Sequence, residues 1–184
     1  MNGIEIQGLR FGEGIPKICV PLTGQGIPAL LSELQRVAAL PADLYEWRID
    51  CFFGDPLPVL PAVVERLGGK PLLCTLRTRQ EGGQASLSPE EYERCVTALL
   101  SVGGFGLVDI ELACGEERVG RLVRLAKKQG VAVVLSKHDF EKTPSAREIT
   151  ATLLRMKDLG AYLPKYAVMP QTPGDVLELL SATW

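Results

Sequence analysis

Hydrophobic and polar positions follow two alternating patterns along most of the chain. Short apolar runs, such as residues 71–76 and 131–136, are typical of buried strands. Longer segments between them, such as 29–40 and 116–129, carry apolar residues at helical spacing. Strands that are joined by helical crossovers are parallel and are buried on both faces. The pattern therefore predicts an α/β fold.

The strand-then-helix unit occurs six times. The expected strands span 17–22, 43–50, 71–76, 107–112, 131–136 and 164–169. The expected helices span 29–40, 59–67, 89–102, 116–129, 144–160 and a last segment from 173. Units of this kind suit either an open doubly wound sheet or a barrel. The first strand is not followed by a GxGxxG segment, which disfavours a dinucleotide-binding fold.

The ends of the expected elements carry local signals. Residues 1–16 alternate weakly between apolar and polar positions and contain several glycines, which predicts an N-terminal β-hairpin. Three expected helices begin with a hydroxyl residue that is followed by proline. A hydroxyl at the N-cap accepts a backbone N–H, and proline suits the first helical position. The expected N-caps are Ser88, Thr143 and Thr172.

Composition narrows the class of protein. Of the 184 residues, 46% are hydrophobic and 23% are charged, as in one ordinary globular domain over residues 1–184. A net charge of −2 gives no reason to expect a nucleic acid or an anionic membrane as partner. No apolar run is long enough to span a bilayer, and residues 1–5 lack a signal-peptide pattern. We therefore expect a cytoplasmic protein.

Cysteine and histidine usage argues against structural crosslinks. The chain has five widely spaced cysteines, without a CxxC pair, so neither a disulfide framework nor a zinc site is expected. A single histidine makes a histidine-rich metal site improbable as well. Cys19 and Cys74 lie inside apolar runs, and we expect both to be small core residues.

One lysine interrupts an otherwise apolar strand. Lys165 lies in the segment 164–170, which begins and ends with proline. Burying an ammonium group without a partner is costly, so this lysine either reaches water at a sheet edge or is buried for a chemical reason. A buried neutral lysine is a nucleophile that can form a Schiff base with a carbonyl compound. This strand alone favours a lysine that reaches water at a sheet edge, but the polar residues on the other strands favour a buried, reactive lysine.

Polar side chains share faces on the other expected strands. In a strand, residues i and i+2 point the same way. Most of the groups lie toward the carboxyl ends of their strands, where α/β sheets and barrels carry their sites. Each taken alone suits a solvated rim, but in a barrel they converge with Lys165 on one small volume. The same-face groups are Glu46, Arg48 and Asp50; Thr75 and Arg77; Asp109 and Glu111; and Ser136 and His138.

This set predicts imine chemistry on a small keto acid. Arg48 and Arg77 supply positive potential, which favours the free amine of a nearby lysine and can bind an anionic substrate. Lys165 can then attack a ketone, and His138 can move protons on the substrate. A plainer interpretation makes His138 a loop or N-cap residue. The carboxylates that can orient the histidine or balance the arginines are Glu46, Glu81 and Glu111.

Five segments carry a family resemblance. They occur in order and at matching spacing over nearly the whole chain, and together they resemble type I 3-dehydroquinate dehydratase. This resemblance implies a (β/α)8 barrel with an N-terminal hairpin over its floor. The segments are EWRID at 46–50, RTRQEGG at 77–83, DIEL at 109–112, SKHDFEKTP at 136–144 and PKYAVMP at 164–170.

The resemblance also implies an activity. Members of the family are lyases of the shikimate pathway of aromatic amino acid biosynthesis, and they work as dimers without a metal or cofactor. They convert 3-dehydroquinate to 3-dehydroshikimate by syn elimination of water through a Schiff base. By resemblance, Lys165 would form the imine, His138 would be the general acid and base, and Glu81 would support the histidine. The implied substrate-binding residues are Glu46, Arg48 and Arg77.

One feature departs from the family pattern. A complete barrel takes about 250 residues and eight units, whereas the pattern here predicts six. We therefore expect an incomplete barrel, C-terminally truncated relative to the family, with open edges at the first and last strands. The family's carboxylate-binding arginine on strand seven and the contacts after strand eight have no counterpart.

Two other functions stay open. The chain can be a weakly active or inactive remnant that acts as a self-associating structural or interaction subunit. An aldolase-type Schiff-base lyase on the same barrel explains Lys165, but it does not explain the histidine segment together with residues 81–83.

Overall fold

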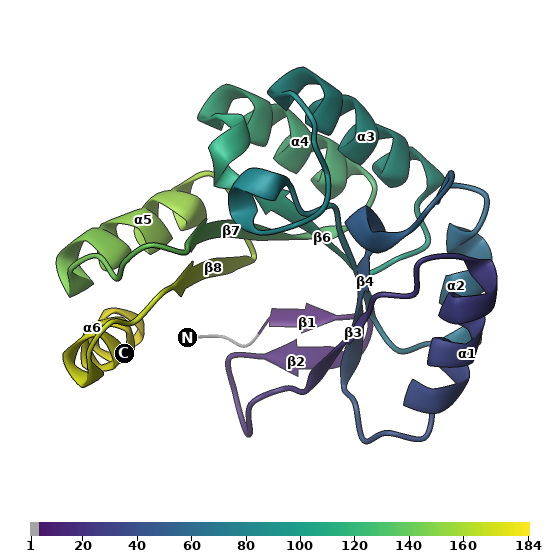
Figure 1. Ribbon diagram of the computed structural model, residues 1–184, viewed down its shortest axis with the longest axis horizontal. Helices are drawn as coiled ribbons and strands as arrows, with labels where there is room; N and C mark the ends of the chain where they lie inside the picture. Colours follow the sequence, from purple (N-terminus) through teal and green to yellow (C-terminus); the bar gives the residue numbers. More distant parts are fainter. Residues whose placement is uncertain (1–3) are drawn as a thin grey trace.

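The computed structural model describes residues 4–184 as a curved parallel sheet with helices on its outer, convex side (Figure 1). All six strands pair in chain order, and each pair is parallel. A doubly wound sheet would reverse its strand order at a switch point, so this order is that of a barrel wall. The strands are β3 (Cys19–Leu22), β4 (Leu44–Arg48), β5 (Leu72–Thr75), β6 (Leu107–Glu111), β7 (Ala132–Asp139) and β8 (Leu163–Val168).

A helix follows each strand, as the spacing of apolar residues predicted. Ser88 and Thr172 cap their helices as expected, each through a capping box. The expected N-cap Thr143 is wrong: Ser145 caps that helix, and the Thr143 hydroxyl donates to the carbonyl oxygen of Met169 instead. The helices are α1 (Ile27–Val37), α2 (Leu60–Arg66), α3 (Pro89–Val102), α4 (Glu116–Lys128), α5 (Ala146–Asp158) and α6 (Pro173–Thr183).

The N-terminal hairpin is confirmed over the described residues. It consists of β1 (Ile4–Ile6) paired antiparallel with β2 (Leu9–Phe11), and it lies on the concave side of the sheet (Figure 1). Ile6 packs there in one apolar cluster with Leu44, Leu73 and other inward residues. The hairpin therefore closes the inner side of the sheet near the amino ends of its strands.

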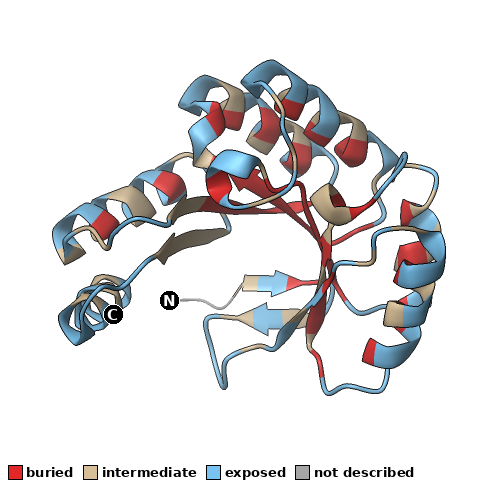
Figure 2. Cartoon of the chain, viewed as in Figure 1, coloured by how far each residue is buried: buried red, intermediate tan, exposed pale blue. Residues whose placement is uncertain are grey.

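The larger core lies between the sheet and the helices. Successive strand residues alternate between the two sides, so Leu73 faces the hairpin whereas Cys74 faces the helices. Figure 2 shows this buried layer running along β4 to β7, whereas β8 and α6 are mostly intermediate or exposed. The prediction that Cys74 is a core residue is confirmed.

Strand β7 is longer than the apolar run predicted. It continues through Ser136, Lys137, His138 and Asp139, and it pairs with β8 so that Ser136 is opposite Lys165. These polar residues remain in the strand because the β8 backbone supplies their ladder hydrogen bonds. His138 is therefore a strand residue, not a loop or N-cap residue.

Candidate active site

Buried polar side chains join the carboxyl ends of β4 to β7. The Thr75 hydroxyl donates to Glu46 over 2.7 Å. The Ser136 hydroxyl donates to Asp109 over 2.6 Å. Glu46 is half-buried, whereas Thr75, Asp109 and Ser136 are buried. The predicted convergence of same-face polar groups is thus confirmed for these strands.

Arg77 forms the centre of this network. Its guanidinium donates to Asp109 over 2.7 Å, to Glu111 over 2.9 Å and to Ser136 over 3.0 Å. The side chain is only 4% exposed, so both ion pairs are shielded from water. Burial acts to lower the pKa of Arg77, but the Asp109 and Glu111 carboxylates together outweigh it and the net pKa is raised. Arg77 therefore stays charged and binds three strands together.

Glu111 links this network to the segment that follows β5. Its carboxylate accepts hydrogen bonds from the backbone N–H and the hydroxyl of Thr78, over 2.9 and 2.6 Å. Burial raises the pKa of Glu111 in spite of these hydrogen bonds. Glu111 makes no hydrogen bond to His138. Of the three carboxylates that were predicted to orient the histidine or balance the arginines, Glu111 therefore pairs with Arg77 and binds Thr78.

His138 pairs with Glu81. The Glu81 carboxylate accepts the backbone N–H of His138 over 2.6 Å and lies 2.7 Å from its ring Nδ1. Because a carboxylate only accepts, Nδ1 carries the proton and Nε2 is left as the basic nitrogen. Both side chains are at most 10% exposed. The predicted support of His138 by a glutamate is therefore seen in the contacts, and the glutamate is Glu81.

An aromatic ring lies parallel to the imidazole of His138. Phe140 stacks on His138, with ring centroids 6.0 Å apart and planes 8° apart. Gly82 lies against the other edge of Phe140: a Cβ atom at Gly82 would be 2.3 Å from its Cζ. The Gly82 backbone also has φ +80°, which disfavours other residues. Glycine at this position therefore leaves room for Phe140 to stack on His138.

Gly82→Ala should separate Phe140 from His138. The new methyl group requires the phenyl ring to swing away, which is easy because Phe140 is 52% exposed. Left-handed backbone strain should cost about 1–3 kcal/mol of unfolding free energy. The measurements are urea unfolding and nuclear Overhauser contacts between the two rings.

Gly68→Ala is the matched control. Gly68 also has positive φ, but nothing lies within 4 Å of an added Cβ. It should show similar strain and keep the ring contacts. Intact ring contacts in Gly82→Ala would contradict the packing described here.

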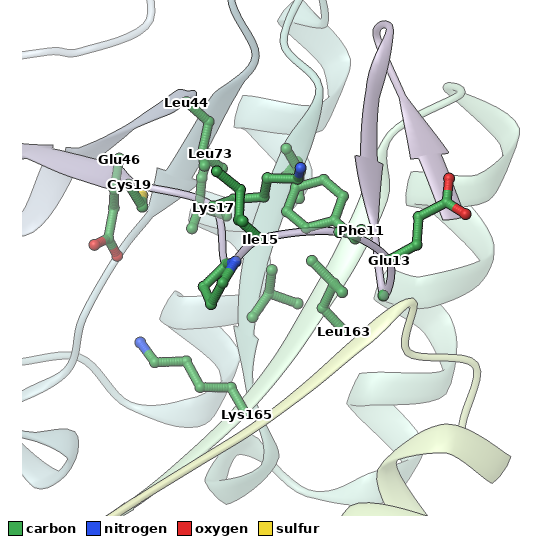
Figure 3. A pocket seen from close by; sticks show the side chains of 15 residues that line it. Phe11, Glu13, Ile15, Lys17, Cys19, Leu44, Glu46, Leu73, Leu163 and Lys165 are labelled. Atoms are coloured by element: carbon green, nitrogen blue, oxygen red, sulfur yellow. The ribbon is translucent and has the colours of Figure 1, made fainter. Parts of the chain in front are cut away.

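Lys165 extends from β8 into a cavity of about 660 Å³ that is also lined by Glu46 and Cys19 (Figure 3). The register of β7 and β8 puts Lys165 opposite Ser136 and two residues before the partner of His138. Within residues 4–184, the Lys165 amine has no ion-pair partner and no hydrogen bond to a side chain. The side chain is half-buried on the side of the sheet that carries the polar network.

Cys19 corrects one expectation. It is exposed to this cavity, not packed in the core, because its side chain lies on the concave side of edge strand β3. Desolvation of the thiol and then the Glu46 carboxylate raise its pKa to about 11. The thiol therefore stays protonated near neutral pH and is a poor nucleophile.

Arg48 lies at the carboxyl end of β4 and pairs with Asp50. Its Nε and Nη2 donate to the two carboxylate oxygens over 2.9 and 2.8 Å. Burial of Asp50 acts to raise its pKa, but hydrogen bonds from Arg48 and from the Gln84 backbone lower it overall. The predicted positive potential of Arg48 and Arg77 is therefore wrong, because carboxylates balance both guanidinium groups.

Asp50 is the residue whose importance sequence reasoning missed. Besides Arg48, it accepts the backbone N–H groups of Arg77 and Gln84. The alternation of Glu46, Arg48 and Asp50 indicated a shared face, but it gave no sign of contacts to a loop 27 or more residues away.

Within residues 4–184, no helix is long and apolar enough to cross a membrane, and no three histidine, cysteine or acidic residues gather as a metal site. Lys165 and the Glu81-bound His138 come from the neighbouring strands β8 and β7 of the curved parallel sheet. The fold therefore defines a protein of the β/α-barrel class, the class that carries its sites at the carboxyl ends of its strands.

The sequence model of the family Type I 3-dehydroquinase matches residues 18–184, so the chain belongs to this family. The 3-dehydroquinate dehydratase of Listeria monocytogenes serotype 4a is 44% identical over 100% of this chain and 75% of its own length. That of Syntrophotalea carbinolica is 45% identical over 100% of this chain and 74% of its own.

Solved structures support the same assignment. The type I 3-dehydroquinate dehydratase of Clostridium difficile, with covalent modified comenic acid, has a TM-score of 0.93 at 37% identity. It is matched over 99% of this chain and 74% of its own. The enzyme of Enterococcus faecalis also has a TM-score of 0.93, at 43% identity, over 98% and 77% of the two chains. The predicted family and barrel fold are therefore confirmed.

Proposed function

We propose that this chain dehydrates 3-dehydroquinate to 3-dehydroshikimate through an imine on Lys165. The activity, that of a carbon–oxygen lyase, follows from full-chain relatives at 43–45% identity that are 3-dehydroquinate dehydratases. The imine is supported by one observation above all. The amine of Lys165 has no ion-pair partner in the described residues and lies in a cavity, near the Glu81-bound His138 in the sheet register.

The reaction begins with the amine. Lys165 Nζ adds to the ketone carbon, the ketone oxygen leaves as water with the two amine protons, and one proton taken up from solvent gives the protonated imine. The imine withdraws electrons and so makes the adjacent C–H acidic. Nε2 of His138 takes that proton, the electron pair forms the C=C bond, and the neighbouring hydroxyl leaves as water with a proton from His138. Water then hydrolyses the imine and restores the free amine.

Three further residues are proposed substrate contacts. Glu46 lines the cavity and is half-buried, so its carboxylate can accept a substrate hydroxyl. Arg48 is one-quarter exposed beside Asp50 and can donate its remaining N–H groups. Arg77 is bound by Asp109 and Glu111, so it stabilises the strands that form the site and can give the substrate only its remaining N–H groups.

His138→Ala should slow elimination by about 100-fold to 10,000-fold, the usual contribution of a general acid and base. Borohydride should still trap an adduct, because the nucleophile is intact. Stopped-flow turnover and intact-mass analysis measure the two effects separately. Glu81→Gln is the companion variant: it keeps the shape of the pair and should lower the rate less. An unchanged rate in His138→Ala would refute the assigned role.

The activity is tested by incubating the protein with 3-dehydroquinate and following product by mass spectrometry. We expect a product lighter by one water. A folded protein that forms none at saturating substrate would contradict the proposed function. The alternative of a self-associating subunit without activity is not favoured by any named relative. A fructose-1,6-bisphosphate aldolase matches at 15% identity and TM-score 0.53, which shows the fold alone.

The finer setting of the enzyme is also proposed. We place it in the shikimate pathway, in the cytoplasm, as a homodimer or other homo-oligomer of single-domain chains over residues 1–184. Five free cysteines support a reducing compartment. Exposed apolar residues on α6, such as Leu177 and Leu180, support self-association.

A further inference from the structure

We propose that Asp50 is a positioning residue that holds two parts of the active site in place at once, Arg48 and the loop that carries Glu81. This inference rests on the proposed function of the site. Asp50 follows β4 in a short 3-10 helix, Ile49–Cys51, and its side chain is fully buried. It does not line the Lys165 cavity, so it acts through its neighbours.

Each oxygen of Asp50 accepts one Arg48 N–H and one backbone N–H, and Oδ2 also accepts the Cys51 thiol over 3.9 Å. Oδ1 accepts Arg48 Nε over 2.9 Å and the Arg77 N–H over 3.3 Å. Oδ2 accepts Arg48 Nη2 over 2.8 Å and the Gln84 N–H over 3.0 Å. Both oxygens are therefore saturated by donors, and only a carboxylate satisfies all four N–H groups.

The two backbone donors stand at the two ends of the loop that contains Glu81. Within the loop, the Arg79 N–H donates to the Ala85 carbonyl over 2.9 Å and the Gly83 N–H donates to the Thr78 carbonyl over 2.7 Å. These bonds close the loop on itself. Asp50 anchors both of its ends to β4, whereas Glu111 anchors Thr78 from the β6 side.

Asp50 therefore connects Arg48, a proposed substrate contact, with the loop that positions Glu81 against His138. If the ends of the loop shift, Glu81 shifts relative to His138, whose Nδ1 it holds at 2.7 Å. Misplacement of a catalytic group by about 1 Å can cost about 100-fold in rate. Asp50 therefore influences turnover through the loop and substrate affinity through Arg48.

Asp50→Asn is the decisive variant. In either orientation its NH2 group faces two N–H donors, so one side chain and one end of the loop lose their acceptor. We expect KM to rise at least about 10-fold and kcat to fall by up to about 100-fold. Asp158→Asn, an exposed acid-to-amide change on α5, is the matched control and should alter neither constant.

The single histidine provides a readout that does not depend on activity. The imidazole 15N spectrum of the wild type should show a protonated Nδ1 and an unprotonated Nε2 at high pH. Asp50→Asn should give a mixture of the two tautomers. If the wild type shows the expected tautomer but no turnover, the proposed function fails while the positioning role is still tested.

An Arg48→Ala background separates the two links. There, Asp50→Asn should no longer raise KM further, but it should still lower kcat and still mix the tautomers. If Asp50→Asn changed neither kcat nor the tautomer ratio in this background, Asp50 would hold only Arg48, and the proposed positioning of Glu81 would be overturned. If Asp50→Asn does not fold, Asp50→Glu serves instead: it keeps the charge and moves it by one methylene. Wild-type kinetics and tautomer in Asp50→Glu would overturn the positioning role.

Discussion

Lys165→Ala should abolish turnover of 3-dehydroquinate and leave the fold intact. The lysine supplies the only nucleophile that the proposed mechanism uses, so its loss removes the imine and with it the acidity of the adjacent C–H. The side chain makes no ion pair in the described residues and is half-buried, so stability should change little. Steady-state kinetics and thermal unfolding measure the two effects.

Lys137→Ala is the matched control for this variant. Lys137 is next to His138 on β7, but it alternates to the opposite side of the sheet, where its amine lies 5.2 Å from the Tyr166 ring centroid. It should retain near wild-type turnover. Residual activity of Lys165→Ala above one hundredth of the wild type, or equal losses in both variants, would contradict the imine mechanism.

Arg77→Met should be the most destabilising single change of a charged residue in the network. It removes the shared partner of Asp109 and Glu111 and leaves two buried carboxylates near each other. Breaking a buried ion pair in this way costs about 3–5 kcal/mol of unfolding free energy. Chemical denaturation at pH 7 measures the loss.

The pH dependence of that loss identifies its cause. Burial already raises the pKa of Glu111, and removal of the neighbouring guanidinium raises it further. Lowering the pH should protonate this carboxyl and narrow the difference from the wild type. Arg121→Met, which breaks exposed pairs with Glu93 and Glu117, is the control and should cost far less. A loss as small as that of Arg121→Met would show that the buried network is not needed for stability.

Most of the scaffold was predictable from local patterns. Apolar runs separated by amphipathic helices specify parallel strands, and the capping boxes at Ser88 and Thr172 mark helix starts with a defined hydrogen-bond geometry. The errors fell where two signals competed. Thr143-Pro144 resembles a helix start, yet Ser145 with Glu148 three residues later makes the capping box that forms.

The faces of the site residues were predictable, but their partners were not. Period-two spacing indicated which polar residues share a face within each strand, and the structure brings Ser136 opposite Lys165 and Arg77 against Asp109. It did not reveal that Arg77 is held between two carboxylates, or that Asp50 reaches the ends of the Glu81 loop. Those contacts depend on side-chain geometry between strands, which spacing along one strand does not encode.

Chemical trapping shows whether Lys165 forms an imine with the substrate. The wild-type protein is incubated with saturating 3-dehydroquinate, reduced with sodium borohydride, digested and mapped by mass spectrometry, with Lys137→Ala and Lys165→Ala treated in parallel. We predict one substrate-derived adduct, confined to the peptide that contains Lys165, in the wild type and Lys137→Ala only. A folded wild-type protein without an adduct, or with its adduct on another lysine, would contradict an imine on Lys165.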